Sequence, residues 1–132
     1  MEPLDVRASV ELDAHPRSAH AARAFIRDFC KAAHIGEDAC ETAALLTSEL
    51  VTNAIIHGRS RAVLTAHTPP PVLRVSVQDD DPQLPDVGDA PGVGAESGRG
   101  LLLVAALASS WGVERTESGG KAVWFELDAG SA

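Results

Sequence analysis

The run ELVTNAIIHG, from Glu49 to Gly58, carries the first side chains whose types and spacing could do chemistry. An acid, an amide and an imidazole follow one another at four-residue steps: Glu49, Asn53 and His57. Side chains four apart lie on one face of a helix, so this spacing predicts a polar stripe with apolar neighbours on both sides. A half-buried carboxylate beside an amide needs partners, which a charged ligand or a metal ion supplies. An ordinary amphipathic helix whose stripe meets water explains the pattern about equally well.

A zinc site does not suit this stripe. Glu49 and His57 are eight residues apart, an amide is a poor zinc ligand, and no second His or Cys stands at ligand spacing. We therefore interpret His57 as a structural residue.

A second group of chemically active side chains is the acidic triplet Asp79, Asp80 and Asp81. It follows the alternating run VLRVSVQ, and Pro82 and Pro85 then force a turn. A carboxylate at a strand end can accept a hydrogen bond from an exocyclic amino group such as that of adenine, and Asp79 is best placed for it. An acidic surface turn stiffened by proline explains the segment as well. Three adjacent carboxylates repel one another, however, so stability alone does not favour them.

A third group, Gly98-Arg99-Gly100-Leu101, opens a predicted apolar helix over residues 98–112. Glycines let a ligand approach the backbone closely, and the free N–H groups of a helix start attract anions. A simple glycine turn between loop and helix explains most such matches. Residues 80–97 hold many Gly, Pro and Asp without periodicity, and they are predicted to form a flexible lid over a ligand.

Periodicity predicts the elements that position these groups. Two helices are expected before the acidic triplet, the first ending at Gly36 and the second running to about His57. The strand-like runs are LDVRASVEL (4–12), RAVLTAH (61–67), VLRVSVQD (72–79), GVERTE (112–117) and KAVWFEL (121–127). Most strand neighbours are joined as hairpins. We therefore expect an α+β two-layer sandwich, with three helices on one face of a mixed, mostly antiparallel sheet of about five strands, in one domain over residues 1–132.

The composition limits the partners. A formal net charge of −8 argues against nucleic acid and anionic membranes, and it favours a protein partner with a basic patch. It is compatible with a bound nucleotide, because backbone N–H groups can hold phosphates inside an acidic protein. Cys30 and Cys40 are too few for a disulfide scaffold and are predicted to be buried thiols. The sequence has no signal peptide and no apolar run of about 20 residues, so a cytoplasmic protein is expected.

The order and spacing of the three segments resemble those of the Bergerat-fold (GHKL) ATPases. More narrowly, they resemble the anti-sigma-factor serine/threonine kinases of bacterial stress and sporulation switches (RsbW- and SpoIIAB-like), especially short actinobacterial members. ELVTNAIIHG resembles the N box of that family, GRGLLLV its second glycine box and KAVWFEL its closing strand. The resemblance covers nearly the whole chain and implies the Bergerat fold, with ATP and Mg²⁺ as cofactors.

The resemblance also implies roles for single residues. Glu49 matches the general base, Asn53 the Mg²⁺-coordinating amide, and Asp79 the acid that reads adenine. The residues that match the phosphate-holding helix start are Gly98, Arg99, Gly100 and Leu101. The implied substrate is a small anti-anti-sigma-type protein, the implied second partner is a sigma factor or similar regulator, and the implied assembly is a homodimer.

Two positions depart from the family pattern. The first glycine box, D-x-G-x-G, has neither glycine here, although Asp79, Pro82 and Pro85 fit a D-x-x-P-x-x-P variant of short actinobacterial members. Ala122 stands where the closing strand often carries a Thr near the adenine. Both departures favour an alternative, a nucleotide-gated protein-binding module without useful catalysis. The catalytic part of a histidine kinase is disfavoured, because the sequence contains no dimerisation helix with a phosphoacceptor His.

Overall fold

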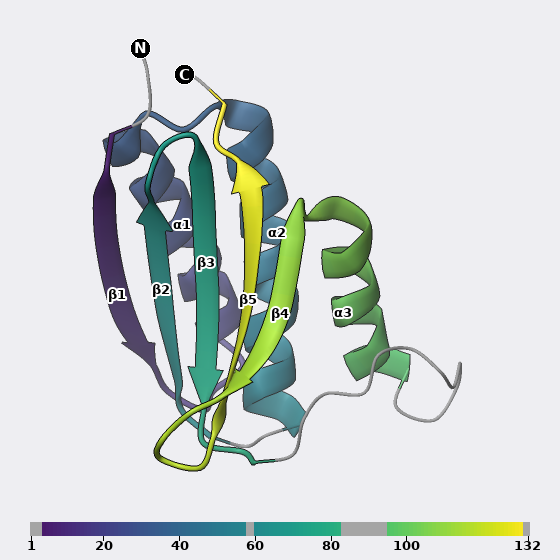
Figure 1. Ribbon diagram of the computed structural model, residues 1–132. Helices are drawn as coiled ribbons and strands as arrows, with labels where there is room; N and C mark the ends of the chain where they lie inside the picture. The colour runs from purple at the N-terminus through teal and green to yellow at the C-terminus, as the bar shows by residue number, and fades with distance from the viewer. Residues whose placement is uncertain (1–3, 58–59, 83–94, 131–132) are drawn as a thin grey trace.

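The computed structural model describes residues 4–57, 60–82 and 95–130 (Figure 1). In order its elements are β1 (Val6–Leu12), α1 (Ser18–Ala33), α2 (Glu37–Thr52), the short π-helix η1 (Asn53–His57), β2 (Ala62–Thr68), β3 (Val72–Asp79), α3 (Ala95–Leu107), β4 (Ser110–Arg115) and β5 (Lys121–Asp128). Its helices lie in two groups along the sequence, one before β2 and one between β3 and β4.

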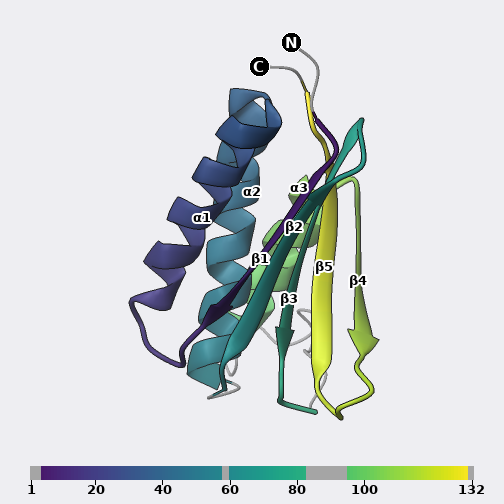
Figure 2. The same ribbon diagram turned by 90° about the vertical axis from the view of Figure 1, so that its left-hand side faces the viewer.

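The strands form one five-stranded sheet in the order β1-β2-β3-β5-β4. All four pairings are antiparallel, so the predicted two-layer fold is confirmed while the predicted mixed sheet is wrong in the described part of the chain. The three α-helices cover one face of this sheet (Figure 2). Strands β3 and β5 are neighbours although α3 and β4 lie between them in the sequence.

The sheet has a buried face and an open face. Along β2, β3 and β5 every second side chain is buried against the helices, as the two-residue period of a strand requires. The largest of the fully buried ones are Leu64, Leu73 and Phe125, which pack with Ile26 of α1 and Leu46 of α2 in one core. The open face is polar, which is typical of an antiparallel sheet with one side in water.

The junction between α1 and α2 differs from the prediction. Helix α1 ends at Ala33, and His34 adopts the left-handed conformation with φ of 60°. The next N–H, from Ile35, donates to the carbonyl of Cys30 at 2.9 Å and satisfies an end carbonyl of the helix. Gly36 is instead the N-cap of α2, so the predicted helix stop at Gly36 is wrong.

Helix α3 begins and ends earlier in the sequence than predicted. It spans Ala95–Leu107, and Trp111 and Gly112 belong to β4. Pairing with β5 explains the early end, because the Ser109 N–H donates to the carbonyl of Glu126 at 2.8 Å and the β4 ladder starts there. A Cβ atom at Gly112 would lie 2.7 Å from the ring of Trp124, so glycine lets that ring pack on β4.

Candidate functional site

Glu49 and Asn53 lie one helical turn apart at the end of α2. The Asn53 N–H donates to the carbonyls of Glu49 and Leu50, so Asn53 continues the α-helical path of Glu49. Both side chains are partly exposed between buried neighbours, among them Leu50 and Ala54. Glu49 and Asn53 therefore form part of the predicted polar stripe, and they lie at one end of the core.

The helix changes type at Asn53. Residues 53–57 form a π-helix, in which each N–H bonds five residues back and each turn is wider than in an α-helix. A four-residue step from Asn53 to His57 therefore no longer completes a turn, and the predicted stripe holds for Glu49 and Asn53 only. The side chain of His57 lies outside the described residues. Single π-turns of this kind occur frequently at functional sites.

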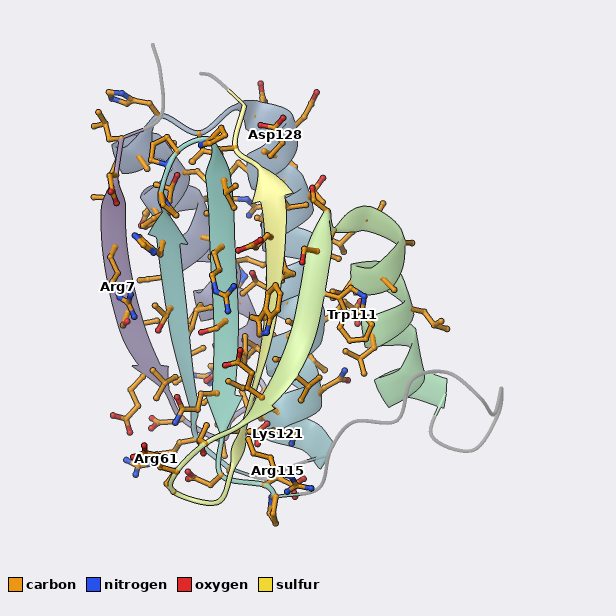
Figure 3. All side chains as sticks on the ribbon, viewed as in Figure 1. Arg7, Arg61, Trp111, Arg115, Lys121 and Asp128 are labelled. Atoms are coloured by element: carbon orange, nitrogen blue, oxygen red, sulfur yellow. The ribbon has the colours of Figure 1, made fainter. Side chains whose placement is uncertain are left out.

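Asp79 is the last residue of β3, and its side chain is only 4% exposed. Two donors meet on its Oδ1 atom: Nζ of Lys121 at 3.0 Å and the backbone N–H of Asp81 at 3.0 Å. Lys121 also donates to the carbonyl oxygen of Asp81 at 3.3 Å, and its Nζ lies 3.8 Å from Oδ2 of Asp81. The Lys121 side chain is itself 9% exposed, so this is a buried ion pair between the end of β3 and the start of β5 (Figure 3).

Lys121 explains why three acids can stand together. One buried ammonium lies beside Asp79 and Asp81 and offsets their repulsion. The third acid, Asp80, is exposed, and its N–H donates to Oγ of Ser60 at 3.3 Å. The triplet is therefore built into the end of the sheet, and the alternative of a simple acidic surface turn is wrong for Asp79.

Lys121 is also the residue that the sequence reasoning missed. In the β3–β5 ladder Asp79 pairs with Lys121, whereas Ala122 pairs with Gln78 and faces the open side of the sheet. The inward-facing neighbour of Asp79 is thus Lys121, whereas Ala122, which was predicted to stand near the adenine, lies on the open face. The signal was present in the sequence: Lys121 is one of two lysines, and it stands at even steps from the inward-facing Val123 and Phe125.

The turn between β4 and β5 packs tightly on the end of β3. A Cβ atom at Gly120 would overlap the carbonyl oxygen of Asp79, so only glycine permits this approach. The Gly120 N–H donates to Oγ1 of Thr116 at 3.0 Å, and Nη1 of Arg115 donates to the carbonyl of Pro82 at 3.2 Å. These contacts fix the course of the chain from Asp79 to Pro82.

The first turn of α3 supplies the free backbone N–H groups of the site. In a helix that begins at Ala95 the free groups of the described part belong to residues 95–97, and Gly98 is the first residue after them. Arg99, Gly100 and Leu101 lie further along the helix, and the predicted helix start at the glycines is wrong. The Leu101 side chain is buried in the core. The side chains of residues 95–100 lie outside the described part.

These elements meet at one end of the molecule. Segment η1 contacts both β3 and α3. Figure 1 shows η1, the end of β3, the start of β5 and the first turn of α3 at the same, lower end of the sheet. The helix that carries Glu49 and Asn53 therefore lies next to the strand that ends in Asp79 and the helix that begins at Ala95.

Two further predictions are the lid over the ligand and the bound Mg²⁺ ion. Residues 83–94 of the predicted lid lie outside the described residues. Within the described ranges no three His, Cys, Asp or Glu side chains are grouped to hold a metal ion, nor does any helix there have the length and apolarity to cross a membrane. A Mg²⁺ ion fits this donor set, because it takes one or two protein oxygens together with water and phosphate oxygens.

Comparison with known proteins agrees with this geometry. The chain resembles two solved structures in fold. Over 92% of its length it superposes on the RsbU and RsbW domains of Rv1364c from Mycobacterium tuberculosis, with a TM-score of 0.69 and 21% identity, and it spans 32% of that chain. Over 86% of its length it matches the histidine kinase domain of the blue-light activated histidine kinase EL346 from Erythrobacter litoralis, with a TM-score of 0.52, 21% identity and 60% of that chain.

Sequence comparison gives a family. The uncharacterized protein SCO4941 of Streptomyces coelicolor is 42% identical over 72 residues, which are 52% of this chain and 69% of that protein. The family model of the histidine kinase-like ATPase domain matches residues 12–127. That match spans every described element from the end of β1 to β5, so the chain belongs to the histidine kinase-like ATPase domain family.

Proposed function

We propose that this protein is an ATP-dependent serine/threonine protein kinase of the anti-sigma-factor type. It phosphorylates a small anti-anti-sigma-type protein, and it sequesters a sigma factor or a similar regulator. The observation that carries this proposal is the position of Glu49 one turn before Asn53, in a helix whose end contacts both β3 and α3. Membership of the ATPase domain family and the fold similarity to a structure containing an RsbW domain support it.

ATP lies across the lower end of the sheet in this proposal. The base meets Asp79 at the end of β3, and the phosphates meet the first turn of α3, on which Gly98 lies. Arg99, Gly100 and Leu101 complete the predicted phosphate segment from further along the same helix. The two ends of the nucleotide are thus held by elements that η1 contacts in common.

Glu49 acts as the general base. Its partly exposed carboxylate takes the proton of the substrate hydroxyl as that oxygen attacks the γ-phosphorus. The bond from the γ-phosphorus to the oxygen shared with the β-phosphate breaks, and ADP leaves with the electron pair. Asn53 would hold Mg²⁺ through its amide oxygen, and the ion would supply positive charge that offsets the charge of the phosphates.

A second candidate function is a nucleotide-gated protein-binding module without useful catalysis. The first glycine box favours it, because neither glycine of the family pattern follows Asp79. Such a module binds ATP without turnover, and its affinity for a partner depends on the nucleotide. In both readings the protein forms a homodimer, and its net charge of −8 favours a partner with a basic surface over nucleic acid or a membrane.

Phosphate transfer from Mg-ATP to a candidate anti-anti-sigma-type protein tests the proposal. We expect Glu49→Ala to lower the rate by about 100-fold or more while ATP binding persists, because only the proton acceptor is lost. Glu41→Ala is the matched control, since Glu41 is an exposed acid on the same helix, paired with Arg27 at 3.5 Å. Equal transfer by the wild type and Glu49→Ala would show that Glu49 is not the base. ATP binding with no transfer by any of the three proteins would favour the binding module.

A further inference from the structure

The buried ammonium of Lys121 can bind a ligand in addition to neutralising the neighbouring acids. It stands at the end of the sheet where the proposed function puts the base of ATP, on the helix-covered face and beside the carboxylate of Asp79, which faces the same way. We propose that Lys121 determines nucleotide specificity. Its ammonium donates a hydrogen bond to a purine ring nitrogen, next to the amino group whose hydrogen bond Asp79 accepts. This inference rests on the proposed binding of ATP.

The donor count of Lys121 supports this role. An ammonium group has three N–H donors. Within the described residues two of them have acceptors, Oδ1 of Asp79 at 3.0 Å and the carbonyl oxygen of Asp81 at 3.3 Å. The remaining oxygen nearby, Oδ2 of Asp81, lies 3.8 Å away, beyond hydrogen-bond distance. One donor of this buried cation thus has no acceptor among the described residues and can meet a ligand.

The acceptor on Asp79 is complementary. Both hydrogen bonds to its carboxylate in the described part of the chain end on Oδ1, so Oδ2 is the atom that an incoming amino group would reach. The pair thus presents a donor and an acceptor side by side. Adenine presents the matching edge, since its 6-amino donor lies between two ring-nitrogen acceptors, N1 and N7.

The opposite face of the sheet offers a matched control. Arg74 of β3 and Glu126 of β5 form a cation–carboxylate pair across the same two strands, with Nη1 and Oε2 3.1 Å apart, on the open face. Arg74→Met therefore removes a cation from the same ladder without touching the proposed base site. Lys121→Met keeps the buried stem of the side chain and removes only the ammonium.

The experiment measures binding of ATP, 1-deaza-ATP and 7-deaza-ATP to the wild type by calorimetry. We expect one of the two analogues to bind about ten-fold more weakly than ATP, because it lacks the acceptor for a charged donor. Lys121→Met should bind ATP about ten-fold more weakly and should no longer distinguish ATP from that analogue. Arg74→Met should keep both the affinity and the distinction.

Three outcomes would contradict this inference. If the wild type binds ATP and both analogues equally, Lys121 makes no contact with a ring nitrogen and the inference is wrong, whether or not the variant folds. If Lys121→Met weakens all three nucleotides by one factor, Lys121 only holds Asp79 in place. If the wild type binds no ATP, the proposed function fails first and this inference fails with it.

Discussion

Two cation–carboxylate pairs join β3 to β5, and their surroundings differ more than their geometry. Lys121 and Asp79 are 3.0 Å apart, and Arg74 and Glu126 are 3.1 Å apart. The first pair is 9% and 4% exposed and faces the helices, whereas the second is 36% and 30% exposed and faces water. Arg74 has a further support, since its guanidinium lies 4.1 Å from the ring centre of Trp124.

The difference shows that burial, and not distance, sets what each pair does. Water screens the open pair and hydrates either partner if the other is lost, so such a pair contributes about 0–1 kcal/mol. The buried pair has no such relief, and loss of one partner leaves an uncompensated charge in the interior. A role of Asp79 and Lys121 in binding the base of ATP, as proposed above, would explain why this ion pair is buried.

The largest expected effect breaks the buried pair. Lys121→Met should lower the free energy of unfolding by about 3–5 kcal/mol, because Asp79 then stays buried without its cation. Urea denaturation of this variant beside the wild type measures the change. A loss below about 1 kcal/mol would mean that water reaches Asp79 and that the two pairs are alike.

The next effect tests how closely the β4–β5 turn approaches the buried pair. Gly120→Ala should cost about 1–3 kcal/mol, since the new Cβ meets the backbone of Asp79, which cannot move alone. Gly112→Ala is the matched comparison, because its Cβ meets only the side chain of Trp124, which can rotate away on the open face. Thermal unfolding of both should show the larger loss for Gly120→Ala, and the reverse order would contradict this account of the turn.

A buried group without an opposite charge sharpens the comparison further. Burial, together with the neighbouring thiol of Cys40, raises the pKa of Cys30 far above its usual value. The folded protein therefore holds a proton that the unfolded chain releases above about pH 8.5. The contribution of this thiol to the free energy of unfolding is fully present below that pH and is lost as the pH rises. The slope is at most about 1.4 kcal/mol per pH unit for one group.

Denaturation midpoints between pH 8 and 10 measure this slope. Cys30→Ala should remove it, and iodoacetamide at pH 8 should label Cys30 of the wild type only after unfolding. Rapid labelling of the folded protein would show that this thiol ionises in place.

The smallest effect breaks the open pair. Arg74→Met should cost less than about 1 kcal/mol, the sum of a screened ion pair and an exposed cation–π contact. Urea denaturation in low salt and in 1 M NaCl should give nearly the same small loss for the variant. A loss as large as that of Lys121→Met would remove the contrast between the two faces.

Much of the fold followed from local patterns. Alternating strands and amphipathic helices each depend on neighbours in the sequence, so they predicted five strands and three helices. The N-box pair Glu49 and Asn53 is local in the same way, since a helix fixes the relation of residues four apart. The roles of these two residues remain predictions.

What the sequence reasoning missed depends on contacts between distant segments. Lys121 and Asp79 are 42 residues apart and meet only because β5 returns beside β3. The early end of α3 depends on pairing with β5, and His34 rather than Gly36 ends α1 because its N–H and that of Ile35 reach the last carbonyls of the helix. The change from α- to π-helix at Asn53 has no signal in the local pattern.

The close meeting of Gly120 with the carbonyl of Asp79 has a topological consequence. Strand β3 ends at Asp79 and β5 begins at Lys121, so α3 and β4 are inserted in the sequence between two strands that are neighbours in the sheet. A short turn from Asp79 to Lys121 would join β3 and β5 directly into a hairpin. Helix α3 and the edge strand β4 thus form one insertion, which supplies the buried Leu101 and Val104 to the core and contacts the helix that carries Glu49.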